Sequence, residues 1–274
     1  MLRSVYKQKW LFIFLPLLLA IFIMYFLSKT PGKTKPSAYH ITLKSRHYSI
    51  PSVAYTFIEL QHSGPRDLSP YVQFSSRSDY SSIHATALNF GNRIANSLAV
   101  FFSPSYKQEN SKIILKLAKS LELTEQLREH IERLGNGLIE EKKPERIISI
   151  FGAIQKEMEQ ELRHQEKEEL AFLVQLGSWL ETMRIISSFL AENYEEKLTH
   201  VLRKPHIADL YLGIFEQMIL DEKIPKDLKF IQIFQRSLKS LEASMDSNKP
   251  TLSKEKVIQL QQELLKLKKL IEEG

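Results

Sequence analysis

The chain has 274 residues, no cysteine and a formal net charge of +6, from 38 basic and 32 acidic residues. Without cysteine it has no disulfide framework, no catalytic thiol and no cysteine-ligated zinc site. Residues 1–50 contain eight Lys or Arg and no Asp or Glu, which leaves 30 basic and 32 acidic residues in the rest of the chain. The basic excess is therefore confined to the amino-terminal part, and no nucleic-acid partner is expected.

Residues 10–27, WLFIFLPLLLAIFIMYFL, form an uncharged apolar run that ends at Leu27. A helix of this length rises about 27 Å, close to the ~30 Å thickness of a bilayer hydrocarbon core. Trp10 and Tyr25 lie near its ends, where aromatic rings favour the headgroup region. Pro16 lies inside the run, and a lipid-spanning helix tolerates an internal proline better than a soluble one. We predict an uncleaved, single transmembrane helix in contact with the lipid bilayer.

Two alternatives to this anchor are a cleaved signal peptide and a buried soluble helix. The run is longer than a usual signal-peptide core, and no small-residue cleavage site follows it closely. Residues 1–9 form a basic leader, and basic residues also follow the run, so anionic headgroups would attract both flanks. The charges tie across the run and do not fix its orientation. We favour a cytoplasmic amino terminus, which places the rest of the chain on the periplasmic side of the inner membrane.

Residues 28–50 contain Pro, Gly, Lys and Ser and are predicted to be a tether, with a brief extended segment near its end. Residues 51–250 are predicted to be a helical domain, and residues 251–274 a carboxy-terminal amphipathic helix. The fold class is all-α, a bundle of seven to nine helices after the transmembrane helix. Helices are expected at residues 52–61, 78–102, 108–123, 125–141, 145–169, 169–192, 206–222, 226–245 and from 253 onward.

The helix expected at residues 78–102 has a stripe of small side chains spaced four residues apart. Such a stripe lets another helix approach closely, although a ligand could use the same gap. The stripe consists of Ala87, Gly91, Ala95 and Ala99.

The most apolar helix of the domain is expected at residues 169–192, so it is predicted to be central. It carries Gly177 beside Trp179. We assign both residues to helix packing, because a tryptophan in such a helix is more often a core residue than a ligand platform.

The last helix has apolar residues at alternating spacings of three and four, as in a coiled-coil seam. The seam lasts about two heptads, so two alternatives stay open: docking on the chain's own bundle, or binding a protein partner. The candidate seam residues are Val257, Leu260, Leu264, Leu267 and Ile271.

The sequence contains no complete catalytic or cofactor motif: it has no phosphate-binding loop, no G-x-S-x-G and no H-E-x-x-H. Glu161 and His164 have the Glu-x-x-His spacing of di-iron bundles, but those sites need a second such pair and two more carboxylates. The surrounding charges indicate a solvated helix face. We predict that the protein is not an enzyme and that it has no metal and no cofactor.

Three stretches resemble a group of uncharacterised bacterial exported helical proteins. They are A-L-N-F-G at residues 87–91, K-L-A-K-S-L-E-L at residues 116–123 and L-G-S-W-L-E at residues 176–181. The similarity covers roughly residues 50–220. It implies an all-α periplasmic domain and no particular activity. Many members of the group resemble lipoproteins or cleaved exports, whereas this chain has a cysteine-free anchor.

The sequence therefore favours a membrane-anchored helical domain that acts as a non-enzymatic interaction or structural module of the cell envelope. The alternative is a membrane-anchored ligand-binding or sensory domain with a pocket near Gly91 and Trp179. A filled bundle would disfavour this alternative, and an apolar cavity with polar groups would favour it.

Overall fold

The computed structural model describes residues 38–43, 46–64, 66–101, 109–138, 144–225, 229–245 and 250–273. The predicted leader and the predicted anchor, with Trp10, Pro16, Tyr25 and Leu27, lie outside the described residues, as does the first part of the predicted tether. Within the described ranges, no helix is both long enough and apolar enough to span a membrane.

The described residues are mainly helical, as the sequence predicts, with nine α-helices among them. These are α2 (Val53–Gln61), α3 (Ile83–Phe101), α4 (Glu109–Ser120), α5 (Glu125–Leu138), α6 (Pro144–His164), α7 (Glu168–Glu192), α8 (Pro205–Leu220), α9 (Lys229–Met245) and α10 (Lys254–Glu273).

The part of the predicted tether that the structure describes is not irregular. Strands β1 (Ala38–Leu43) and β2 (Arg46–Pro51) pair antiparallel, with Ala38 opposite Pro51 and Leu43 opposite Arg46. Both strands contain tyrosine and isoleucine, which fit a pleated surface well. The hairpin leads directly to Ser52 and helix α2.

Several helix starts follow from local chemistry. Pro144 and Pro205 occupy the first positions of α6 and α8, where the missing amide hydrogen has no intrahelical partner to lose. Thr124 Oγ1 accepts a hydrogen bond from the Leu127 amide at 3.3 Å and caps α5. Ser253 Oγ accepts one from Lys256 at 3.4 Å at the start of α10.

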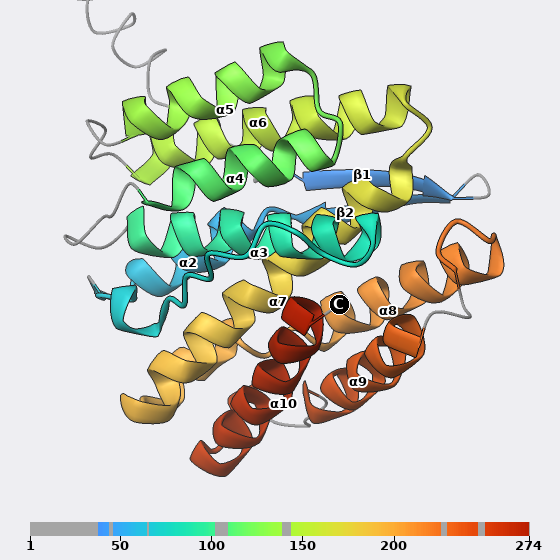
Figure 1. The fold of residues 1–274 in the computed structure, drawn as a ribbon. Helices are drawn as coiled ribbons and strands as arrows, with labels where there is room; N and C mark the ends of the chain where they lie inside the picture. Colours follow the sequence, from blue (N-terminus) through green and yellow to red (C-terminus); the bar gives the residue numbers. More distant parts are fainter. Residues whose placement is uncertain are drawn as a thin grey trace, which may run out of the picture. The chain divides into compact units, whose positions relative to one another are not determined.

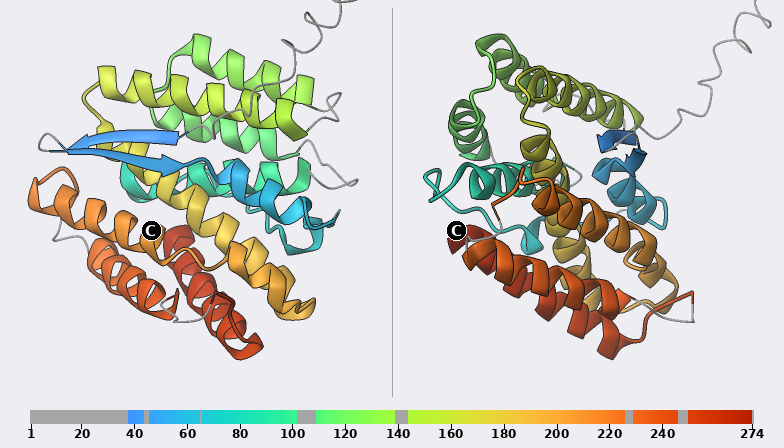
Figure 2. Two further views of the ribbon diagram at one scale, coloured as in Figure 1. Left: turned by 180° about the vertical axis from the view of Figure 1, so that it is seen from behind. Right: turned by 90° about the vertical axis from the view of Figure 1, so that its right-hand side faces the viewer.

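Helix α7 is the central helix, as expected from its composition. Every residue from Leu170 to Leu190 is buried, including its polar ones. Helix α3 packs along α7, helices α4, α5 and α6 lie on one side of this pair, and α8, α9 and α10 lie on the other (Figure 1). The views in Figure 2 show the same two layers, here called the α4–α6 layer and the α8–α10 layer.

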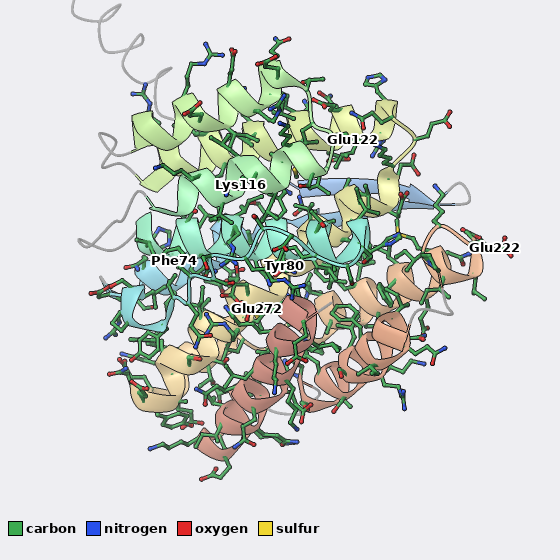
Figure 3. The ribbon with its side chains drawn as sticks, in the orientation of Figure 1. Phe74, Tyr80, Lys116, Glu122, Glu222 and Glu272 are labelled. Carbon is green, nitrogen blue, oxygen red and sulfur yellow. The ribbon has the colours of Figure 1, made fainter. Side chains whose placement is uncertain are left out.

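Three helices end in a left-handed residue that is a glutamate rather than the usual glycine. Glu122, Glu166 and Glu222 have φ angles of 60°, 59° and 59°. After α4, the Leu123 amide donates to the Ala118 carbonyl at 3.1 Å, which is the long bond of a Schellman turn. Figure 3 labels Glu122 in the α4–α6 layer and Glu222 in the α8–α10 layer.

Candidate functional site

Helices α3 and α7 cross with their backbones in direct contact. A Cβ atom added at Gly91 would lie 2.0 Å from the Val174 carbonyl oxygen, and one added at Gly177 would lie 2.1 Å from the Leu88 carbonyl oxygen. Only glycine fits at either position, because helix backbone cannot move aside as a flexible side chain can. The other members of the small-residue stripe, Ala87, Ala95 and Ala99, are fully buried on α3.

Trp179 is a core residue on α7. Its ring lies 4.9 Å from the ring of Tyr211 on α8, centroid to centroid, at an interplanar angle of 31°. The Tyr211 hydroxyl donates to the Gln175 carbonyl at 3.3 Å, and burial raises the pKa of this tyrosine far above its ordinary value. Trp179 therefore supports the contact between α7 and α8.

The seam of α10 packs inside the chain's own domain. Its side chains are almost completely buried, and α10 lies against both α7 and α9. The Asn89 side chain on α3 also donates to the Ile271 carbonyl at 2.7 Å. Of the two alternatives left open by the sequence, docking is the one that the structure shows. The docked residues are Val257, Leu260, Leu264, Leu267 and Ile271.

An apolar cavity of about 80 Å³ lies on the other side of α3, where the α4–α6 layer covers the α3–α7 pair. Each covering helix contributes to its wall: Ile114 from α4, Ile131 from α5 and Ile154 from α6. Phe90 on α3 and Ser178 on α7 also line the cavity, so it lies beside the α3–α7 crossing. The Ser178 hydroxyl donates to the Gly91 carbonyl at 2.9 Å. The pocket expected near Gly91 is thus present as a space, but Trp179 does not line it.

Besides Ser178, two buried polar side chains line this cavity. Ser52, 2% exposed, precedes α2, and its hydroxyl has no hydrogen-bond partner among the described residues. It occupies the N-cap position without making the usual cap bond to the helix. Gln175, 3% exposed, lines the wall formed by α7, and its amide can both donate and accept.

The cavity wall carries one charged side chain among the described residues, Glu132 on α5. Glu132 is exposed, so its carboxylate is solvated. Serine, glutamine and apolar side chains make up the rest of the wall. The arrangement offers burial and hydrogen bonding, but it lacks the charge that would neutralise an anion.

A buried cluster of charges fixes α7 to α10. Arg184 donates to both oxygens of Glu181 at 2.8 Å, and Lys268 donates to Glu181 Oε1 at 2.9 Å. Burial alone would raise the pKa of Glu181, but Arg184 and Lys268 outweigh it and hold that pKa below its usual value. Burial lowers the pKa of Lys268, and the attraction of Glu181 offsets this only in part.

This charge cluster also holds the loop between α2 and α3. Arg184 donates to the Tyr71 carbonyl at 2.8 Å, and Lys268 approaches the Gln73 carbonyl at 3.5 Å. Figure 3 shows Tyr80 of the same loop beside Glu272 of α10. Because each charge of the cluster has a partner, we assign the cluster to structure.

Helix α3 contributes a polar stripe that faces this region. Asn89, Asn92, Arg93 and Asn96 are spaced three, four and seven residues from the first, and all are buried. Asn96 donates to the Gln73 carbonyl at 3.3 Å. The sequence analysis did not predict this stripe, although polar residues at helical spacing within an apolar segment are a visible signal.

Glu161 and His164 do not form a metal site in the structure. Glu161 Oε2 accepts a hydrogen bond from the Thr124 hydroxyl at 2.8 Å, and Glu161 Oε1 accepts one from Gln165 at 3.2 Å. His164 is exposed. In the described part of the chain, no group of three or more histidine, aspartate and glutamate residues is placed to hold a metal ion. Glu161 therefore joins the start of α5 to α6.

The comparisons with known proteins gave no match, whether with protein-family models, with curated proteins or with solved structures. The resemblance to bacterial exported helical proteins therefore stays a prediction.

Proposed function

We propose that the chain is a membrane-tethered, non-enzymatic binding protein whose helical domain takes up a small apolar ligand in the cavity beside α3 and α7. The observation that carries this proposal is the cavity itself, an apolar space lined by a buried hydroxyl that has no partner in the described part of the chain. Well-packed domains contain few spaces larger than a water molecule, so a lined cavity is a candidate binding site.

Ligand binding is favoured over partner binding through α10 because the seam of α10 is already used in the domain's own core. A partner would have to displace α10 from α7 and α9 to reach these side chains. It would also have to break the bond between Lys268 and Glu181. The cavity needs no such rearrangement.

The size of the cavity limits what it can hold. Its volume of about 80 Å³ is roughly half of the ~150 Å³ of an engineered apolar cavity that binds benzene. A fitting ligand, or the buried part of a larger one, has about five heavy atoms. At a ceiling of ~1.5 kcal/mol per heavy atom, such a ligand binds with a Kd of about 3 µM at best and more often in the millimolar range.

Binding can be tested with the full-length chain in lipid nanodiscs, with butan-1-ol as the probe and ligand-observed NMR as the readout. Empty nanodiscs give the background from partition into lipid. Ile154→Phe should fill the cavity and remove the protein-dependent signal. Ile83→Phe is the matched control, because Ile83 is exposed at the start of α3. Equal signals from both variants and the unchanged chain would rule out the cavity as the site.

The proposed tether rests on the uncharged run at residues 10–27 and its basic flanks. Residues 10–27 would contact the bilayer, and the helical domain would lie on the periplasmic side of the inner membrane. Replacing Leu15 and Leu18 by Lys should release the chain from the membrane fraction, because a charge near the bilayer centre costs about 2.5–3.5 kcal/mol. Protease treatment of intact cells and of spheroplasts would then report the side on which the domain lies.

A further inference from the structure

We infer that the ligand of this cavity carries a neutral oxygen, as in an alcohol or a ketone, which forms a hydrogen bond with Ser52. The inference rests on the proposed function, because it specifies the chemistry of the same cavity. It narrows the class of ligand from any small apolar molecule to a molecule with a short aliphatic body and an uncharged oxygen at one end.

The first argument is the state of the Ser52 hydroxyl. Native proteins pair nearly all buried polar groups, because an unpaired one loses its bonds to water without replacement. Ser52 is buried, lacks a partner among the described residues and lines the cavity. A ligand oxygen in the cavity can supply the missing bond, as acceptor or as donor.

The second argument is the start of α2. Ser52 and Val53 both line the cavity, so the first turn of α2 lies at its wall. The first amide hydrogens of a helix lack intrahelical acceptors, and the helix dipole makes this end partly positive. Ser52 does not cap α2 with its side chain. A partly negative ligand oxygen suits this wall, whereas an ammonium group does not.

The third argument separates a neutral oxygen from a carboxylate. A buried carboxylate requires a positive partner, and the described wall has no lysine, arginine or histidine. The one charged residue of the wall, Glu132, would repel an anion. Gln175 provides a neutral amide instead, which pairs equally well with a carbonyl or a hydroxyl. The wall chemistry therefore points to an uncharged polar end.

The test compares probes of nearly equal size on the full-length chain in nanodiscs, again by ligand-observed NMR. Butan-1-ol and butan-2-one carry a neutral oxygen, pentane carries none, butanoate is an anion and butan-1-amine is a cation. We expect butan-1-ol and butan-2-one to bind about tenfold more tightly than pentane, and butanoate and butan-1-amine to bind more weakly than either.

Two variants assign the preference to Ser52. Ser52→Ala should reduce the tenfold preference over pentane to less than twofold, while pentane itself still binds. Ser244→Ala is the matched control, since Ser244 is a buried serine on α9 whose hydroxyl donates to the Ser240 carbonyl at 2.8 Å. If Ser52→Ala fails to fold, as judged by circular dichroism, Gln175→Leu with the same probes takes its place and should reduce the preference at least threefold.

Each result has a distinct meaning. Tight binding of the two neutral oxygen probes that depends on Ser52 supports the inference. Equal binding of pentane and butan-1-ol, or strongest binding of butanoate or butan-1-amine, overturns the inference and leaves the proposed function standing. If Ile154→Phe does not change the binding of any probe, including pentane, the proposed function fails and the inference fails with it.

Discussion

Glu181 on α7 and Glu159 on α6 are both mostly buried carboxylates, but burial has opposite outcomes at the two positions. Glu181 has two buried cations beside it, and its pKa lies below the ordinary value. Glu159 has Arg163 at 2.7 Å, but that arginine is largely exposed, and burial raises the pKa of Glu159 to about 7. The buried carboxylate between α7 and α10 is therefore electrostatically matched, whereas Glu159 in the α4–α6 layer is not.

Neutral groups show this contrast only in part, since Asn92 on α3 and Thr182 on α7 also have buried side-chain atoms without a partner among the described residues. In the region around α7 and α10, the loop carbonyls of Tyr71 and Gln73 accept bonds from Arg184 and Lys268. In the region covered by the α4–α6 layer, the Ser52 hydroxyl has no partner within the described ranges and lies beside an apolar space. Matched polar groups hold a fold together, and an unmatched group next to a space is available to a ligand. Variants on each side can break or sharpen this distinction.

The largest effect is expected at the charge cluster. Glu181→Leu would leave Arg184 and Lys268 buried without their anion and should lower the free energy of unfolding by ~3–5 kcal/mol in urea titrations. The matched control is Glu216→Leu, which breaks an ion pair with Lys239 of 2.7 Å at the surface. That change should cost at most ~1 kcal/mol. Similar losses in both variants would show that the cluster is no better matched than a surface pair.

The α3–α7 crossing joins the two regions, and the second prediction concerns its glycine. Gly91→Ala places a methyl group against the Val174 carbonyl and should destabilise the domain by ~3 kcal/mol in the same titrations. Gly213→Ala is the control, because nothing lies within 4 Å of an added Cβ atom there. Gly213 lies within α8, so Gly213→Ala should raise the free energy of unfolding by ~1 kcal/mol. A tolerated alanine at Gly91 would mean that α3 can shift and that the cavity wall is adjustable.

The third prediction uses pH to separate the regions. Because the pKa of Glu159 is raised to about 7 in the folded chain, the folded state keeps this carboxyl protonated between pH 4.5 and about 7, whereas the unfolded state does not. The free energy of unfolding therefore falls as pH rises through that window. Glu159→Gln should therefore be more stable than the unchanged chain by ~1–2 kcal/mol at pH 8 and equal to it at pH 4.

The lowered pKa of Glu181 acts in the opposite direction and in a different window. The stability that it contributes is present above pH 4.5 and is lost as pH falls through its folded-state pKa. We therefore expect the free energy of unfolding, measured from pH 3 to pH 8, to differ between the unchanged chain and Glu159→Gln only above about pH 4.5. Identical profiles across the whole range would contradict the assigned burial of Glu159.

The helices could be predicted from sequence because their signals are local. Apolar periodicity, the prolines at 144 and 205 and the capping residues Thr124 and Ser253 act within one turn of the chain. The apolar composition of residues 169–192 also identified the central helix, because a helix that is apolar on all sides is buried on all sides. The hairpin of β1 and β2 was predicted only as a brief extended segment, because two short strands of six residues each give a weak signal.

The candidate site could be predicted only in part. The small stripe around Gly91 indicated where α3 approaches another helix, but the cavity beside it depends on how three later helices cover that pair. Ser52 has the position of an ordinary N-cap, and the sequence cannot reveal that its hydroxyl makes no cap hydrogen bond to α2. Glu181 and Lys268 lie 87 positions apart, so their pairing depends on the tertiary fold.

The smallest effects concern two of the three left-handed glutamates, Glu122 in the α4–α6 layer and Glu222 in the α8–α10 layer. Glu222→Gly relieves a backbone conformation unfavourable to side chains and should raise the free energy of unfolding by ~0.5–1 kcal/mol, after the larger entropy of glycine in the unfolded chain is allowed for. Glu122→Gly relieves the same strain but removes the ion pair with Lys167, so its gain should be smaller. Urea titrations of both variants and of the double variant measure this difference. Equal gains would show that the ion pair between Glu122 and Lys167 contributes nothing, and a loss at either position would show that the left-handed turn is held by its glutamate side chain rather than strained by it.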